Sequence, residues 1–133
     1  MKNNVAAWLR LCYWAGAIID ILAGLTMLFP SLFTLRNKPV AFQPGLDYRY
    51  AMYMGARLMF GWTVLLLWAE RKPLERKGVL LVTLLVIVGE AATQAWGIAV
   101  GFVPFQTLLP AFGLQIMLGT LFIFSYVMAA RIS

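Results

Sequence analysis

The chain contains no histidine and only one cysteine, Cys12. A disulfide needs two cysteines, and zinc sites and the common Ser-His or Cys-His nucleophiles need histidine or several cysteines, so these chemistries are excluded within one chain. Motifs for phosphate binding, zinc hydrolysis and serine hydrolysis are also absent. Without histidine, a pair of carboxyl groups would have to act as both acid and base. We therefore predict no enzyme activity, no cofactor and no metal centre.

Charged residues are scarce as well. Only 12% of the 133 residues are charged and 62% are hydrophobic, whereas soluble domains have about 25% and about 45 to 50%. This balance predicts the lipid bilayer as the main partner of the chain. The net charge of +6 would also suit a nucleic-acid-binding protein, but four of the eleven basic residues crowd into segment 71–77. Such crowding is typical of a loop at a membrane surface, so no nucleic-acid partner is predicted.

Four apolar segments are long enough to cross a bilayer as helices, because about 20 residues at about 1.5 Å each cover a hydrocarbon core of about 30 Å. The first segment continues past Asp20 without a small-residue cleavage site, which predicts an uncleaved span instead of a signal peptide. Pro110 is expected to bend or restart the fourth helix. The predicted spans are residues 11–29, 50–69, 78–101 and 105–129.

The connections between these spans predict how the helices are arranged. The second and third connections are short, which makes consecutive helices antiparallel neighbours. Residues 30–49 contain three prolines and a Pro44-Gly45 turn, and are expected to form an irregular surface loop. The sequence lacks the period-two alternation of apolar and polar residues that is typical of β-barrel strands. The sequence therefore predicts an all-α protein, a single integral membrane domain over residues 1–133, built as an up-down-up-down bundle of four transmembrane helices.

Basic residues predict the orientation of this bundle. Seven fall on one side of the predicted membrane and three on the other. Because cytoplasmic loops carry the excess of lysine and arginine, both termini and segment 70–77 are predicted to be cytoplasmic, in the inner membrane of a cell. The seven are Lys2, Arg10, Arg71, Lys72, Arg76, Lys77 and Arg131, and the three are Arg36, Lys38 and Arg49.

Five polar residues are predicted to lie deep in the membrane. Counted from the outer helix ends, the charged ones lie at roughly 10 to 17 Å. An unpaired charge at this depth costs at least about 2.5 to 3.5 kcal/mol, so Arg57 is expected to meet Asp20 and Glu90. Glycines recur four residues from several of these positions, as at Gly24 beside Asp20, which indicates faces where helices approach closely. The five are Asp20, Arg57, Glu90, Gln94 and Gln115.

The charges of this cluster suggest a function and leave an alternative open. Two carboxylates and one guanidinium sum to minus one, which favours a protonated carboxyl group or a bound cation. The first hypothesis is a site for a small ligand or cation, with transport coupled to protonation. The alternative is a structural or assembly subunit of a membrane complex, in which the cluster only holds the helices together. A monomer, a homodimer and a larger complex are all compatible with the sequence.

Segment 48–83, YRYAMYMGARLMFGWTVLLLWAERKPLERKGVLLVT, resembles part of a family of small uncharacterised prokaryotic four-helix integral membrane proteins. The resemblance covers about a quarter of the chain. It implies a helical membrane protein and no particular activity.

Overall fold

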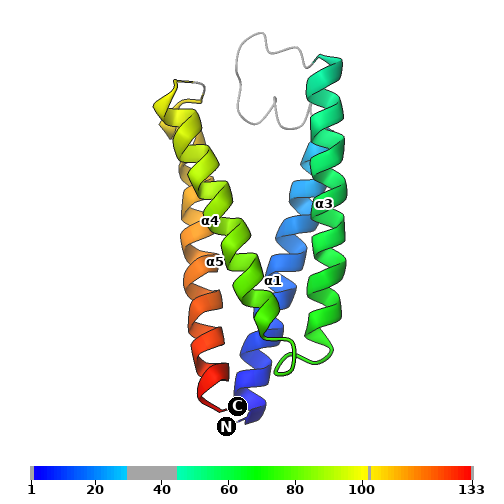
Figure 1. Cartoon of the computed structure of the whole chain (residues 1–133), viewed down its shortest axis with the longest axis vertical. Helices are drawn as coiled ribbons and strands as arrows, with labels where there is room; N and C mark the ends of the chain where they lie inside the picture. The colour runs from blue at the N-terminus through cyan, green and yellow to red at the C-terminus, as the bar shows by residue number, and fades with distance from the viewer. Residues whose placement is uncertain (1, 30–44, 102, 133) are drawn as a thin grey trace. The chain divides into compact units, whose positions relative to one another are not determined.

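The computed structural model describes residues 2–29, 45–101 and 103–132, which form four α-helices and no strand. All four helices are long and apolar enough to cross a membrane. The predictions of an all-α fold and of a multi-pass membrane protein are thus confirmed. The predicted loop lies mostly at residues 30–44, outside the described residues. The helices are α1 (Lys2–Leu28), α3 (Leu46–Glu70), α4 (Gly78–Ala99) and α5 (Phe105–Arg131) (Figure 1).

Three helices are longer than the apolar segments that predicted them. α1 begins at Lys2 instead of residue 11, α3 begins at Leu46 instead of residue 50, and α5 continues to Arg131 instead of residue 129. Hydropathy detects only the length inside the hydrocarbon. Backbone hydrogen bonds continue a helix beyond it, through polar residues such as Asp47 in the first turn of α3.

Of the two effects predicted for Pro110, a bend or a restart of the fourth helix, the restart does not occur. α5 runs without interruption from Phe105 through Pro110. Proline removes one backbone N–H and therefore one hydrogen bond to the residue four positions earlier, here Gln106. Spanning helices tolerate such a loss where neighbouring groups satisfy the freed carbonyl. The helix instead begins directly after Pro104, whose φ of −65° and ψ of 137° place it outside the helix.

Large apolar side chains are exposed on the helices. Leu58 on α3, Leu85 on α4 and Ile116 on α5 are each at least 70% exposed. Soluble proteins rarely expose extended apolar surface of this kind, because water disfavours it. Hydrocarbon removes that cost, so these side chains are expected to contact lipid tails.

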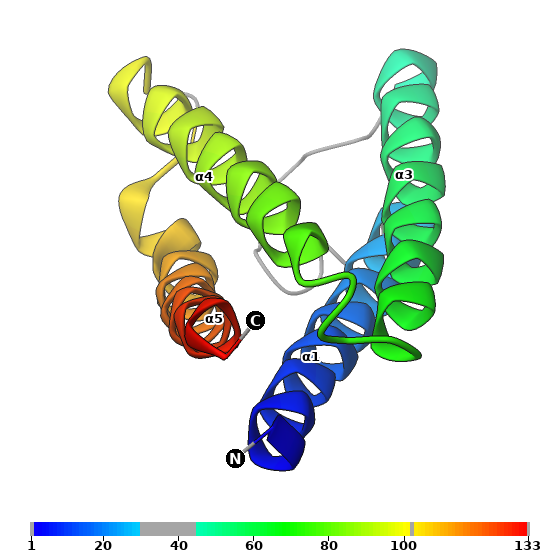
Figure 2. The same ribbon diagram turned by 60° about the horizontal axis from the view of Figure 1, so that its bottom comes forward.

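The helices pack as two compact units, of which the first comprises Met1–Tyr13 and Ala69–Ser133. In this unit α4 and α5 lie side by side and antiparallel (Figures 1 and 2). The first half of α1 packs on α5, where the Cys12 thiol donates a hydrogen bond to the Ser125 hydroxyl at 3.1 Å. The ring of Trp8 meets Phe124 edge-on at 6.2 Å between centroids. The unit therefore has a buried seam between α1 and α5.

The second unit comprises Trp14–Trp68, in which the rest of α1 packs against α3. Gly24 lies so close to Phe60 that a Cβ on the glycine would be 2.9 Å from Phe60 Cε1. A Cβ on Gly55 would lie 3.1 Å from Met27 Sδ. As the residue number rises along α1, the number of its α3 partner falls, so the two helices are antiparallel. The predicted close approach at Gly24 is confirmed.

Replacing Ser125 by alanine tests the seam between α1 and α5. Ser125 is fully buried and accepts the hydrogen bond from Cys12, so Ser125→Ala is expected to lower the free energy of unfolding by about 0.5 to 1.5 kcal/mol. Thr120→Ala is the control, because Thr120 donates only within its own helix, to the Ile116 carbonyl at 2.8 Å. Unfolding by sodium dodecyl sulfate in mixed micelles, followed by circular dichroism, measures both. Equal losses would contradict a contribution from the seam.

Candidate functional site

Glu90 is the only acidic or basic residue between residues 78 and 130. It lies near the middle of α4, which spans Gly78–Ala99, and therefore deep in the hydrocarbon of a membrane that α4 crosses. A carboxylate at this depth carries a large desolvation cost unless a proton, a bound cation or a cationic side chain neutralises it. The partners of Glu90 therefore decide what this site can do.

Two glutamine side chains contact the Glu90 carboxyl group. Gln94, one turn further along α4, donates from Nε2 to Glu90 Oε1 at 3.4 Å. Gln115 on α5 lies within hydrogen-bonding reach of the same carboxyl group. The structure thus brings together three of the five predicted site residues, across the α4–α5 interface. Both contacts come from neutral amides, which orient the carboxyl group without cancelling its charge.

The amide oxygens of both glutamines are available as acceptors. Gln94 Oε1 and Gln115 Oε1 are buried, and within the described part of the chain neither accepts a hydrogen bond. A buried acceptor without a donor is costly, and such groups in native structures call for an explanation. Together with Glu90 they form a set of oxygen atoms without a positive partner among the described residues of their own unit. Such a set suits a protonated group or a cation, which prefers carboxylate and carbonyl oxygens.

Asp20 and Arg57 both lie in the second unit, on α1 and α3 respectively. Arg57 is exposed, and its Nη1 lies 4.0 Å from Met54 Sδ on the same helix. No ion pair between Arg57 and Asp20 is present in the described residues. The contacts at Gly24 and Gly55 explain the separation, because they align Asp20 with a point five to seven residues beyond Arg57 on α3. This corresponds to about 8 to 10 Å along the helix axis.

The predicted pairing of Arg57 with Glu90 would join the two units, and it stays a prediction. Asp20 and Arg57 belong to the second unit, and Glu90, Gln94 and Gln115 form the polar cluster of the first.

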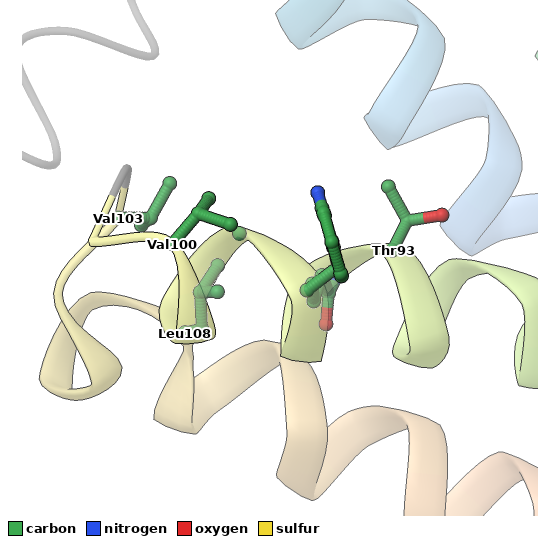
Figure 3. Close-up of a pocket in the computed structure, with 7 residues that line it drawn as sticks. Thr93, Val100, Val103 and Leu108 are labelled. Carbon is green, nitrogen blue, oxygen red and sulfur yellow. The ribbon is translucent and has the colours of Figure 1, made fainter.

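A groove of about 480 Å³ adjoins this cluster at the end of α4. Gln94 lines the groove as well as contacting Glu90, so the two features meet at one side chain. Thr93 projects from α4, Val100 and Val103 project to the same side from the connection after α4, and Leu108 comes from α5 (Figure 3). The remaining lining residues are Trp96 and Gly97. The groove is thus an apolar hollow with polar groups at one end.

The sequence interpretation missed this groove, although a signal for it exists. Small residues recur every four positions at Thr93, Gly97 and Gly101, which leaves one face of the α4 end without bulky side chains. Gly101 has φ +75°, a left-handed conformation that glycine adopts without a Cβ penalty. It permits the reversal that brings Leu108 to the groove.

Comparisons of the chain with protein-family models, with curated proteins and with solved structures find no match. Any function assigned to this chain therefore has to follow from its own residues and geometry.

Proposed function

We propose that this protein is a multi-pass protein of the inner membrane whose polar cluster, Glu90, Gln94 and Gln115, binds a small ligand or cation in exchange for a proton. The observation that carries the proposal is the isolation of Glu90. It is the only acidic or basic side chain between residues 78 and 130, and its partners in the first unit are two neutral amides. A carboxyl group in this setting alternates between a protonated form and a cation-bound form at the lowest cost.

The apolar groove supports a ligand larger than an ion. Its volume of about 480 Å³ falls within the range of about 300 to 1,000 Å³ that is usual for small-molecule sites. Gln94 links the groove to the carboxyl group, so a ligand seated there would lie about one helical turn from Glu90. An amine or another hydrogen-bond donor on that ligand would find the acceptor oxygens of the cluster.

The proposal assigns roles to the residues of the second unit and to the topology. Arg57 acts as a counter-ion or as an anchor for an anionic group, and Asp20 is a second titrating carboxyl group. The helices cross the membrane up-down-up-down with both termini in the cytoplasm, which is supported by seven basic residues on that side against three on the other. A site built within one chain functions in a monomer, and a homodimer would widen the path.

One observation favours a structural role instead. The contact between Glu90 and Gln115 joins α4 to α5, as expected of a polar group that holds helices together in a membrane. In that case the carboxyl group would stay neutral, and the protein would act as a subunit of a larger membrane complex.

Infrared spectroscopy of the protein in lipid nanodiscs separates the two roles, because it detects the C=O stretch of a neutral carboxyl group. Under the proposal, a band that is absent from Glu90→Gln disappears as the pH is raised. α5 presents no acidic or basic side chain before Arg131, so no neighbouring charge in the α4–α5 pair complicates the assignment. Asp20→Asn is the matched control, because it removes a carboxyl group of the other unit. A Glu90 band that never titrates while the protein stays folded would establish the structural role.

Adding a cation tests the exchange itself. A cation that binds the carboxylate stabilises the deprotonated form, so sodium chloride is expected to move the titration midpoint to lower pH. Choline chloride at the same ionic strength controls for screening. A midpoint that both salts leave unchanged would reject exchange with sodium.

A further inference from the structure

The connection between α3 and α4, residues 71–77, is fixed to α1 at two points in the first unit. Directly before the connection, at the last residue of α3, Glu70 Oε1 forms an ion pair with Arg10 Nε at 3.5 Å. Near its end, the fully buried Tyr13 donates a hydrogen bond from its hydroxyl group to the Arg76 carbonyl oxygen at 2.9 Å. Pro73, in the middle, is also buried. We call residues 71–77 the anchored loop.

Hydrogen bonds within the anchored loop hold its backbone in consecutive tight turns. The N–H of Lys72 donates to the Ala69 carbonyl at 3.2 Å, and the N–H of Arg76 donates to the Lys72 carbonyl at 3.1 Å. The loop therefore presents its side chains from a fixed backbone. Arg71 and Lys72 are exposed on this backbone.

The anchored loop and its contacts carry an excess of positive charge. Both nearby acids already have basic partners, Glu70 in Arg10 and Glu75 in Lys72, whose Nζ lies 3.1 Å from Glu75 Oε2. Counting these two acids against the five basic residues Arg10, Arg71, Lys72, Arg76 and Lys77 leaves a net charge of +3.

We infer that the anchored loop binds the phosphate headgroup of an anionic phospholipid. The loop joins two helices that are each long enough to span a membrane, so it lies at the level of the headgroups. Guanidinium groups match the oxygen geometry of phosphate. Within the same unit, the apolar residues Leu81 and Val82 in the first turns of α4 are exposed next to the loop. Basic residues next to an apolar helix surface fit a molecule that has both a phosphate and acyl chains. A free phosphate or a nucleic acid, which has no acyl chains, fits this surface less well.

The two contacts to α1 distinguish a built site from general attraction of basic residues to an anionic membrane. A mobile basic segment attracts anionic lipids by its charge alone. A fixed backbone holds the same charges in one arrangement and loses less freedom on binding, which increases selectivity. Tyr13→Phe removes one contact without changing any charge, so it tests the arrangement separately. This inference does not depend on the polar cluster at Glu90.

Spin-labelled phosphatidylglycerol and phosphatidylcholine, added to the full chain in phosphatidylcholine vesicles, measure the selectivity as a ratio of association constants. The ratio is expected to favour phosphatidylglycerol and to fall about fivefold for each basic residue removed in Arg71→Gln and Lys77→Gln. Arg49→Gln, a basic residue at the first turns of α3 in the other unit, is the control and should leave the ratio unchanged.

Tyr13→Phe should lower the ratio although all charges are retained. A wild-type ratio of one, an equal fall in Arg49→Gln, or a full ratio in Tyr13→Phe would each overturn the inference. A competition experiment with inorganic phosphate tests whether the site binds free phosphate instead of a lipid. Displacement of phosphatidylglycerol by millimolar phosphate at constant ionic strength would show a site for free phosphate, whereas unchanged binding supports the lipid.

Discussion

Gly24→Ala is expected to have a free energy of unfolding about 1 to 3 kcal/mol lower than that of Gly61→Ala, the usual cost of overpacking a close contact. The new methyl group would lie 2.9 Å from Phe60 Cε1 and 3.0 Å from Cζ, closer than carbon atoms approach without displacement. The aromatic ring is rigid and belongs to the facing helix, so either the ring or α3 has to move. The expected result is a loosened contact between α1 and α3 in the second unit.

Gly61→Ala is the matched control for this change. Gly61 lies in α3 directly after Phe60, and a Cβ there meets no atom within 4 Å. Both substitutions gain the same helix propensity of about 1 kcal/mol, so the difference between them isolates the contact with Phe60. Unfolding by sodium dodecyl sulfate in mixed micelles measures both. Phe60→Leu in the Gly24→Ala background should restore part of the loss, and equal stabilities of the two alanine variants would contradict the close approach.

The spans themselves were predictable because the membrane imposes a length. About 20 apolar residues are needed to cross it, and the four segments that meet this condition are the four helices of the structure. Helix ends were less predictable, since the hydrogen bonds of α1 continue to Lys2 in a region where hydropathy no longer constrains the sequence. Whether Pro110 would restart the fourth helix was not predictable, because its effect depends on whether neighbouring groups satisfy the freed carbonyl, which a single sequence does not reveal.

In the polar site, contacts within one helix could be predicted from the sequence, whereas contacts between helices depend on how the helices pack. Glu90 and Gln94 are four residues apart on one helix, so their contact follows from helical geometry alone. Depth in the membrane was enough to associate Gln115 with them. The pairing of Asp20 with Arg57 depends in addition on the alignment of α1 with α3, which is set by steric contacts such as that of Gly24 with Phe60. This alignment of the two helices cannot be predicted from the spacing or the number of apolar residues.

Replacing the whole polar cluster with leucine is expected to stabilise the protein. In the triple variant Glu90→Leu, Gln94→Leu and Gln115→Leu, α4 and α5 would carry no acidic or basic group between residues 78 and 130. Glu90 is exposed on its helix, and a charged side chain deep in the hydrocarbon costs at least about 2.5 to 3.5 kcal/mol on insertion scales, a cost that leucine avoids. The two buried amide oxygens that lack donors would also disappear. The same variant is expected to lose every carboxyl titration that depends on Glu90.

The sign of this change separates the two candidate roles of the cluster. If Glu90 and Gln115 only held α4 to α5, their removal would cost the interhelical hydrogen bond, on average about 0.6 kcal/mol in membrane proteins. A site kept for binding retains polar groups at the expense of stability, so its removal has the opposite effect. Gln106→Leu, an exposed glutamine on α5 outside the cluster, controls for added apolar surface. Unfolding by sodium dodecyl sulfate gives the sign directly, and a loss of stability confined to the triple variant would favour the structural role.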